Sequence, residues 1–387
     1  MKITNYKAYA VYANFRNWVF IRMETDEGIY GVGEATVEWK TNAVLGALED
    51  LRPYVIGADP RRFEWHFFEC FRELYWRIDP VTLSAIAGLE LAMVDITGKY
   101  YNLPAYQFFG GKLRDNIRFY GNGWWKGAKT IEDFAQKAKS SVESGATGLK
   151  WDPFGKSYLT ISNDELERVV NTVACVRETI GTKIDLMIEG HGRFNVHTAI
   201  RIAKALAPYS PYYFEEPVTP DVIEDTVEVH RKSPIPIATG ERFLTKYMYR
   251  ELLEKKGADY LQPDVIHVGG MTELKKIAGM AEAYNVQLAP HNPNGPVAAA
   301  ANLHLCAVIP NCEVLELMIH DATWRTEIST EIYNIQDGYI SIPDTPGLGI
   351  DLNIEAMEKY PQRFTPQNLF NDTLYQAHES GTHKKLI

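Results

Sequence analysis

The chain has 387 residues, of which 45% are hydrophobic and 23% are charged, and its formal net charge is −10. This composition is typical of a folded globular protein and excludes disordered, collagen-like and coiled-coil chains. Because acidic residues are in excess, neither nucleic acid nor an anionic membrane is an expected partner, and a small molecule is favoured. At about 150 residues per domain, the length predicts two or three domains.

The cysteines and the N-terminus bear on where the protein works. Its four cysteines form no CxxC pair, so neither a disulfide framework nor a thiolate metal site is predicted. The first residues lack the continuous apolar stretch of a signal peptide, and no apolar run reaches about 18 residues. We therefore expect a cytoplasmic protein.

The opening part of the chain reads as an α+β domain over residues 1–115. Apolar and polar residues alternate in Trp18–Glu24, and a turn separates that stretch from Ile29–Val32, which predicts an antiparallel hairpin. From about residue 42 to residue 112 the apolar spacing becomes helical, with stops expected at Gly98 and at Gly110.

Over residues 116–342, short apolar runs alternate with helical segments. Eight such units over about 220 residues predict one (β/α)8 barrel of the TIM type, a subclass of the α/β folds. No GxGxxG or GxxxxGK[ST] motif supports a nucleotide site. Residues 343–387 are expected to pack back on the first domain, as a cap completed by both chain ends. The predicted strands are Arg118–Trp124, Gly148–Asp152, Ile184–Glu189, Tyr212–Glu216, Pro236–Thr239, Tyr260–Pro263, Val286–Pro290 and Val314–Met318.

Chemically reactive side chains gather at the ends of these strands, where barrel enzymes keep their active sites. Since side chains at positions i and i+2 of a strand point the same way, we expect Glu189 and His191 to face the barrel axis together, and likewise Lys150 and Asp152. The residues at the ends of the second to eighth strands are Lys150, Asp152, Glu189, His191, Glu215, Glu241, Asp264, His291 and Glu316.

Three of these carboxylates are evenly spaced. Glu189, Glu215 and Glu241 follow one another at 26 residues, one strand–helix unit each (215 − 189 and 241 − 215). Carboxylates on neighbouring strand ends repel one another unless a cation lies between them. All-oxygen ligation suits Mg²⁺, with Mn²⁺ as the next choice. Each acidic residue taken alone is equally well explained as a solvated loop residue or a helix cap.

Two histidines suggest what such a site does. Asp264 ends the strand next to that of His291 and can fix its tautomer and raise its basicity, while His191 stands beside the expected metal. A metal that binds a substrate carboxylate would stabilise an ene-diolate as one histidine removes the α-proton and the other protonates a leaving hydroxyl. This chemistry is β-elimination of water from a hydroxy acid.

The motifs around these residues resemble the enolase superfamily, mandelate racemase subgroup, over essentially the whole chain. Within that subgroup the chain is similar to acid-sugar dehydratases of the galactonate and gluconate type. The stretch Lys150–Gly155 and the His-Gly-Arg step after Glu189 are similar to archaeal-type gluconate dehydratases. The fragments that carry the resemblance are Ile188–Phe194, Phe214–Pro217, Gly240–Arg242, Leu261–Asp264, Ala289–Asn292 and Leu315–Glu316.

The resemblance implies a role for each matching position. His291, paired with Asp264, would take the α-proton, and His191 would expel the 3-hydroxyl. Glu316 would bind the substrate carboxylate or enolate oxygen. The Mg²⁺ ligands would be Glu189, Glu215 and Glu241, the catalytic set would include Lys150, and the remaining substrate contacts would be Asp152 and Arg193.

The implied reaction is dehydration of D-gluconate, D-galactonate or both to the 2-keto-3-deoxy acid, as in Entner–Doudoroff metabolism. The first domain would cap the barrel, with the loop at residues 14–18 closing over the sugar, and a homo-oligomer, up to an octamer, is implied. Two positions depart from the family pattern: Glu189 replaces the usual Asp, and Asp152 replaces the second lysine of a Lys-x-Lys pair. The second change removes the base needed for racemisation or epimerisation.

Other functions stay open at this stage. A dehydratase of another acid sugar and an epimerase of the same superfamily are the nearest alternatives. A barrel glycosidase also uses carboxylates at the barrel mouth, but it needs two of them and no metal. A non-catalytic binding barrel is the least favoured hypothesis, because every expected polar position holds a chemically competent residue.

Overall fold

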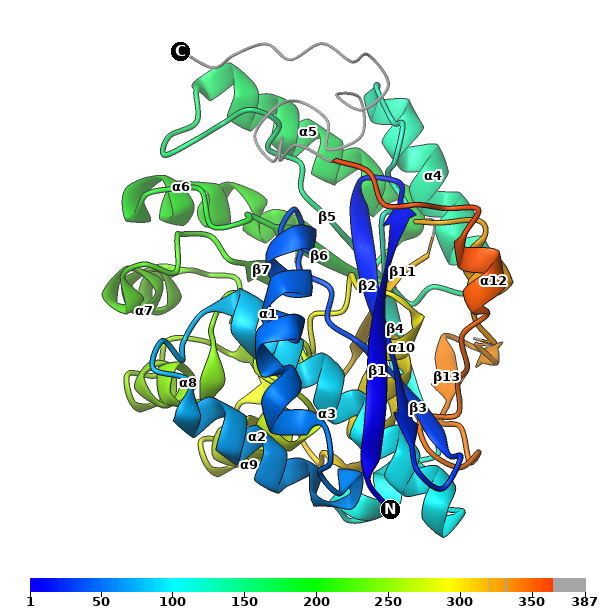
Figure 1. Cartoon of the computed structure of the whole chain (residues 1–387). Helices are drawn as coiled ribbons and strands as arrows, with labels where there is room; N and C mark the ends of the chain where they lie inside the picture. The colour runs from blue at the N-terminus through cyan, green and yellow to red at the C-terminus, as the bar shows by residue number, and fades with distance from the viewer. Residues whose placement is uncertain (320, 331–332, 365–387) are drawn as a thin grey trace.

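The computed structural model describes residues 1–319, 321–330 and 333–364. Figure 1 shows the N-terminal strands in blue, with helices α1 to α3 beside them, against a barrel whose outer helices run through green to yellow. The cap sheet is antiparallel in the order β1-β2-β3, which confirms the predicted hairpin. The first strand was not predicted, because its buried positions do not alternate regularly. The three strands are β1 (Ile3–Ala13), β2 (Arg16–Thr25) and β3 (Tyr30–Glu34).

Helix α3 (Pro80–Tyr101) is the core helix of the cap. It is long and apolar enough to span a membrane, but 89% of that apolar window is buried inside the protein. The predicted stop at Gly98 is wrong: the helix runs on to Tyr101 and is ended by Asn102, which has a φ of 53°. A Cβ on Gly98 would lie 2.5 Å from the backbone of Gly347, so this glycine allows a close approach of two segments. The other cap helices are α1 (Thr41–Val55) and α2 (Phe63–Glu73), with 3₁₀ turns at Pro60–Arg62 and Ala105–Phe109.

All eight predicted barrel strands are present and parallel. They follow one another around the ring from β4 to β10, and β11 pairs with β4. The chain entering β11 closes the ring, because Leu288 N donates to Asn311 O (2.7 Å) and Glu313 N donates to Leu288 O (2.8 Å). The strands are β4 (Asn116–Asn122), β5 (Gly148–Trp151), β6 (Asp185–Glu189), β7 (Tyr213–Glu215), β8 (Ile237–Thr239), β9 (Tyr260–Leu261), β10 (Gln287–Leu288) and β11 (Leu315–Met318).

Helices on the outside of the barrel separate successive strands. In α5, for example, the Ser162 hydroxyl accepts the N–H of Glu165, acidic residues fill the first turn and Gly181 ends the helix at a φ of 72°. The strand β11 is followed only by the short α11, so the eighth unit is incomplete. The helices are α4 (Ile131–Glu143), α5 (Asn163–Ile180), α6 (Val196–Leu206), α7 (Ile223–Lys232), α8 (Thr245–Glu254), α9 (Met271–Ala283), α10 (Pro296–Val308) and α11 (Arg325–Ile328), with a 3₁₀ turn at Ala207–Tyr209.

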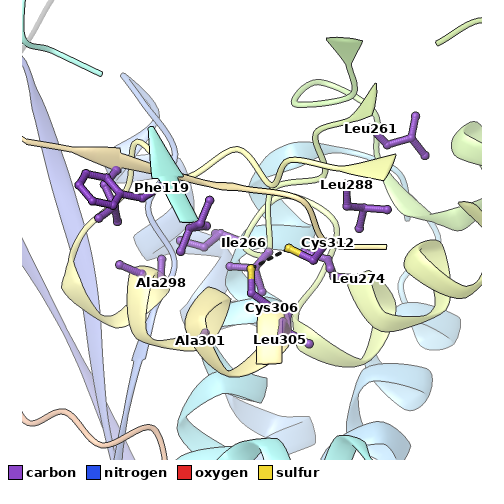
Figure 2. Close-up of a cluster of buried hydrophobic side chains, with 14 of the residues drawn as sticks. Phe119, Leu261, Ile266, Leu274, Leu288, Ala298, Ala301, Leu305, Cys306 and Cys312 are labelled. Atoms are coloured by element: carbon purple, nitrogen blue, oxygen red, sulfur yellow. Dashed lines mark hydrogen bonds between the residues drawn. The ribbon is translucent and has the colours of Figure 1, made fainter. Parts of the chain in front are cut away.

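The barrel core lies between the strands and these helices. Figure 2 shows part of it, with Phe119 of β4 and Leu288 of β10 in one buried cluster with Leu274 of α9 and Leu305 of α10. Cys306 and Cys312 are free thiols in this core, and their Sγ atoms are 3.0 Å apart.

The segment after the barrel runs along both domains. A β-hairpin of β12 (Ile335–Gln336) and β13 (Tyr339–Ser341) pairs with the start of β4. Beyond it, Leu348 N donates to Asp95 Oδ1 of the cap (2.9 Å), and Tyr12 N donates to Tyr360 O (3.0 Å). The short helix α12 (Ile354–Met357) lies between these two contacts. The predicted packing of residues 365–387 falls outside the described residues.

Two buried carboxylates hold the cap on the barrel. Glu34 accepts the N–H groups of Gly295 (2.6 Å) and Ala298 (3.0 Å) at the start of α10. Glu90 accepts those of Met271 (2.5 Å) and Thr272 (3.0 Å) at the start of α9. The first N–H groups of a helix have no partner within the helix, so each carboxylate satisfies donors that would otherwise be buried without one.

We predict that removing either carboxylate destabilises the protein. Glu34→Ala and Glu90→Ala should each lower the free energy of unfolding by about 1–3 kcal/mol, because helix N–H groups are left buried and unsatisfied. Urea-induced unfolding measures this change. The control is Glu73→Ala at the exposed end of α2, which should stay within about 0.5 kcal/mol of the unmodified protein. Equal effects at all three positions would contradict the docking role.

Candidate active site

A cavity of about 490 Å³ lies where the cap meets the carboxyl ends of the barrel strands. Both domains line it, so it closes only when the cap is in place. From the predicted cap loop at residues 14–18, Phe15 and Arg16 reach the cavity. The barrel contributes, among others, Lys150, Asp152, Glu189, His191, Glu241, His267 and His291.

The three evenly spaced carboxylates converge beside this cavity. Glu189 and Glu215 are the last residues of β6 and β7, and Glu241 follows β8. One oxygen of each lies within 4.8 Å of the other two. Lys150 on β5 is buried against them, with its Nζ 2.9 Å from Glu215 Oε1 and 3.4 Å from Glu189 Oε2. The spacing in the sequence therefore becomes a cluster in space.

The cluster fits a divalent cation. The Oε2 atoms of Glu189 and Glu215 are buried and have no hydrogen-bond partner among the described residues. Burial raises the pKa of Glu189 well above its usual range, and the neighbouring charge of Glu215 raises it further. Full ionisation of the three carboxylates therefore needs positive charge beyond that of Lys150. Oxygen ligands without thiolates are the donor set that Mg²⁺ or Mn²⁺ prefers.

His291 and Asp264 form a pair at the ends of β10 and β9. His291 Nδ1 donates to Asp264 Oδ2 over 2.8 Å, and His291 Nε2 lies 3.1 Å from Glu241 Oε2. Burial lowers the pKa of His291, but the charge of Glu241 and the hydrogen bond to Asp264 outweigh it and raise that pKa to about 10. A cation on the cluster would share the charge of Glu241 and weaken this effect.

The backbone conformation that places His191 beside the cluster differs from the expected strand conformation. It lies beyond the end of β6 with a φ of 49°, so strand alternation does not set its direction, although Glu189 and His191 both line the cavity. Its backbone N–H donates to Glu189 Oε1 (2.6 Å), and its Nδ1 lies 2.7 Å from Asp152 Oδ2. A left-handed backbone is strained for a residue other than glycine and often marks a functional position. At Gly192, which follows, a Cβ would overlap the guanidinium of Arg242.

Arg193 does not line the cavity, and here the structure corrects the expectation of a substrate contact. Its side chain is fully buried, and it donates to the carbonyls of Gly190 (2.9 Å) and Gly155 (2.8 Å) and to Asp152. Asp152 therefore lies between Arg193 and His191. This arrangement makes Arg193 a support for the Asp152–His191 pair.

Glu316 on β11 is buried behind Lys150. Its Oε1 accepts from Lys150 Nζ (2.9 Å) and from Asn122 Nδ2 (2.9 Å), and its Oε2 accepts the N–H of Asn292 (2.9 Å). Burial raises the pKa of Glu316, but the charges of Lys150 and His291 and the hydrogen bonds that Glu316 accepts together outweigh burial and lower it overall. All ten residues singled out in the sequence thus lie in one connected network.

Sequence reasoning missed several residues of the site. Asn122 follows from no spacing rule, although it stands at a strand end like the others. Arg16 is buried at the cap side of the cavity, where it pairs with Glu38 (3.0 Å) and contacts the Pro293 carbonyl. His267 lies three residues after Asp264 in a loop. No periodic pattern identifies such loop and cap residues, because their positions depend on contacts between the two domains.

The comparison with protein families agrees with this architecture. The mandelate racemase/muconate lactonizing enzyme N-terminal domain matches residues 12–110, and the enolase C-terminal domain-like family matches residues 133–357. The chain belongs to the enolase superfamily. Its members are enzymes, and the predicted fold, a capping domain with a TIM-type barrel, is confirmed.

Individual relatives extend this result along the chain. The D-gluconate dehydratase of Thermoproteus tenax is 33% identical over 344 residues, which are 88% of this chain and 69% of that protein. A structure of an enolase superfamily member from Salmonella Typhimurium has a TM-score of 0.88 at 30% identity and covers 93% of this chain and 98% of its own. A mandelate racemase/muconate lactonizing enzyme-like protein from Roseovarius gives 0.88 at 32% identity, with 95% and 97% covered.

We predict that Mg²⁺ stabilises the protein through the carboxylate cluster. At about 100 times its Kd, a bound ligand adds about 2.7 kcal/mol to the free energy of unfolding. Thermal unfolding in EDTA and in Mg²⁺ measures the effect. Glu215→Gln should lose most of the Mg²⁺-dependent rise in Tm. Glu216→Gln is the matched control and should keep it, because Glu216 pairs with Arg242 (2.6 Å) outside the cluster. An identical response of the two variants would contradict the assignment.

Proposed function

We propose that this enzyme is a hydro-lyase that dehydrates a six-carbon aldonate, D-gluconate or D-galactonate or both, to the 2-keto-3-deoxy acid. One observation carries the proposal: two histidines face one carboxylate cluster from opposite walls of the barrel. His191 follows β6 and His291 follows β10, four strands apart in a ring of eight. The similarity to a D-gluconate dehydratase supports the same reaction and the same substrate class.

The chain's own residues divide the chemistry between them. Asp264 accepts the Nδ1–H of His291 and so leaves its Nε2 to remove the proton from C2 of the substrate. His191, oriented by Asp152, donates a proton to the hydroxyl on C3 as that group leaves. The C2–H and C3–O bonds break, water departs, and the enol that remains tautomerises to the 2-keto-3-deoxy acid.

The acidic residues supply the electrostatic part. Glu189, Glu215 and Glu241 would hold Mg²⁺, which when bound would stabilise negative charge developing on the substrate carboxylate. Lys150, held by Glu215 and Glu316, keeps a positive charge at the same edge of the site. Because these residues bind the carboxylate end of the substrate, the two histidines lie next to its C2 and C3 atoms.

The alternatives fit this geometry less well. An epimerase of the family pattern uses the second lysine as its base on the face opposite His291, and that position holds Asp152, which is hydrogen-bonded to His191. A glycosidase uses two carboxyl groups about 5–10 Å apart and no metal, whereas three carboxylates here have oxygens within 4.8 Å of one another. The homo-oligomer, the cytoplasmic location and the choice of Mg²⁺ over Mn²⁺ stay predictions.

A panel of sugar acids tests the reaction and the substrate together. With Mg²⁺, we expect 2-keto acid to form from D-gluconate, D-galactonate or both, and we expect EDTA to abolish it. D-Mannonate and D-xylonate serve as comparison substrates. If no aldonate is converted, the proposal is overturned, and full activity in EDTA would favour a metal-independent enzyme instead.

The two histidines should separate the two half-reactions. His291→Asn should abolish exchange of the C2 proton with deuterated solvent and should lower dehydration by about 10²–10⁴-fold, the usual contribution of a general base. His191→Asn should lose dehydration to a similar extent but retain measurable C2 exchange. NMR in D₂O follows both signals. Unchanged activity in either variant would remove the role assigned to that residue.

A further inference from the structure

His267 is a cavity residue that the proposed reaction does not use. It follows Asp264 by three residues, and its backbone N–H donates to Asp264 Oδ1 (3.2 Å) beside that of Ile266 (2.7 Å). The carboxylate that orients His291 therefore also holds the turn that carries His267. The two imidazole rings are 6.3 Å apart between centroids.

His267 lines the cavity, and one nitrogen of its side chain has no hydrogen-bond partner among the described residues. The residue is only 9% exposed, it lines the cavity, and its Nε2 is buried with no hydrogen-bond partner among the described residues. Its Nδ1 is 3.8 Å from Asp264 Oδ2, too far for a hydrogen bond. A buried polar atom without a partner costs free energy, so such an atom in a cavity calls for a ligand group.

A metal ion is not that ligand. Asp264, His267 and His291 lie close enough to suggest a second cation site. The Asp264 carboxylate, however, already accepts four hydrogen bonds, from the two backbone N–H groups, from His291 and from Asn294 Nδ2 (2.8 Å). Four bonds use the acceptor positions of a carboxylate, which leaves none for a cation.

The position of His267 indicates which part of a substrate it meets. Glu241 contacts the Nε2 side of His291, whereas Asp264 contacts its Nδ1 side. His267 lies by Asp264, so it is on the side of His291 away from the carboxylate cluster. A substrate whose carboxylate lies at the cluster must place the groups beyond C3 elsewhere in the cavity, and His267 lines that cavity outside the cluster. An imidazole nitrogen can donate to or accept from a hydroxyl, which matches a polyol chain.

We propose that His267 is a specificity residue whose Nε2 hydrogen-bonds a hydroxyl group beyond C3 of the sugar acid. This inference rests on the proposed aldonate dehydration. It assigns His267 to binding the distal chain, apart from the proton transfers of His191 and His291. Recognition of a hydroxyl by a buried polar group is a strong source of selectivity, since an analogue without that hydroxyl leaves the group unpaired.

The test compares His267→Leu with His267→Gln, whose amide can replace the imidazole Nε2. For the six-carbon substrate, His267→Leu should raise KM by about 10- to 100-fold with kcat reduced less than about 3-fold, and His267→Gln should recover most of the loss. D-Glycerate, a three-carbon acid without any hydroxyl beyond C3, should inhibit competitively with the same Ki in all three proteins. Mg²⁺-dependent Tm values verify that the variants fold. His66→Gln, a buried histidine of α2 outside the cavity, is the matched control.

The outcomes separate this inference from the proposed function. If the unmodified enzyme converts no aldonate, the proposed function fails and the inference falls with it. If the enzyme is active and His267→Leu leaves KM unchanged, the inference alone is overturned. An equal loss of affinity for D-glycerate and for the six-carbon substrate, or a loss in kcat with a shifted pH profile, also overturns it, because His267 would then act through Asp264 and His291. Should His267→Leu fail to fold, His267→Ala takes its place, and an unchanged KM in that variant overturns the inference in the same way.

Discussion

The buried Glu189 and Glu215 and the half-buried Glu241 have oxygens within 4.8 Å of one another, and the rest of the site is arranged around this cluster. Lys150 balances part of its charge from β5, and it is shared with Glu316. His291 touches the cluster through Glu241, and His191 touches it through its own backbone N–H. A cation would allow all three carboxylates to ionise, and each proton-transfer group is placed relative to the cluster that would hold it.

The cap contacts the barrel next to the residues proposed to transfer protons. Glu34 and Glu90 bind the first N–H groups of α10 and α9, the helices that follow the strand ends carrying His291 and Asp264. Cap docking therefore fixes the same two units of the barrel that hold the histidine–aspartate pair. The cavity between the domains then takes one wall from the barrel and the other from the cap, including Arg16.

The strand ends could be predicted from the sequence, because buried parallel strands appear as short apolar runs and a barrel repeats them at a regular interval. That regularity located the carboxylate cluster. It did not apply two residues beyond a strand, where His191 adopts a left-handed backbone that the alternation rule does not cover. The regular strand spacing also could not predict contacts such as that of Glu34 with Gly295, 261 residues apart, because no local sequence pattern shows which distant segments contact each other. The support role of Arg193 was hidden for the same reason.

The placement of the reactive groups explains how one barrel can separate reaction from selectivity. Groups that act on the carboxylate, C2 and C3 stand at strand ends, where short strands and their hydrogen bonds hold them rigidly. Groups that meet the distal chain stand in the turn after β9 and in the cap loops, which can vary without moving the cluster. His267 sits at the border of these two sets, because Asp264 fixes both its backbone and the ring of His291. A change in substrate preference would thus begin at His267 and the cap, and it would leave the carboxylate cluster intact.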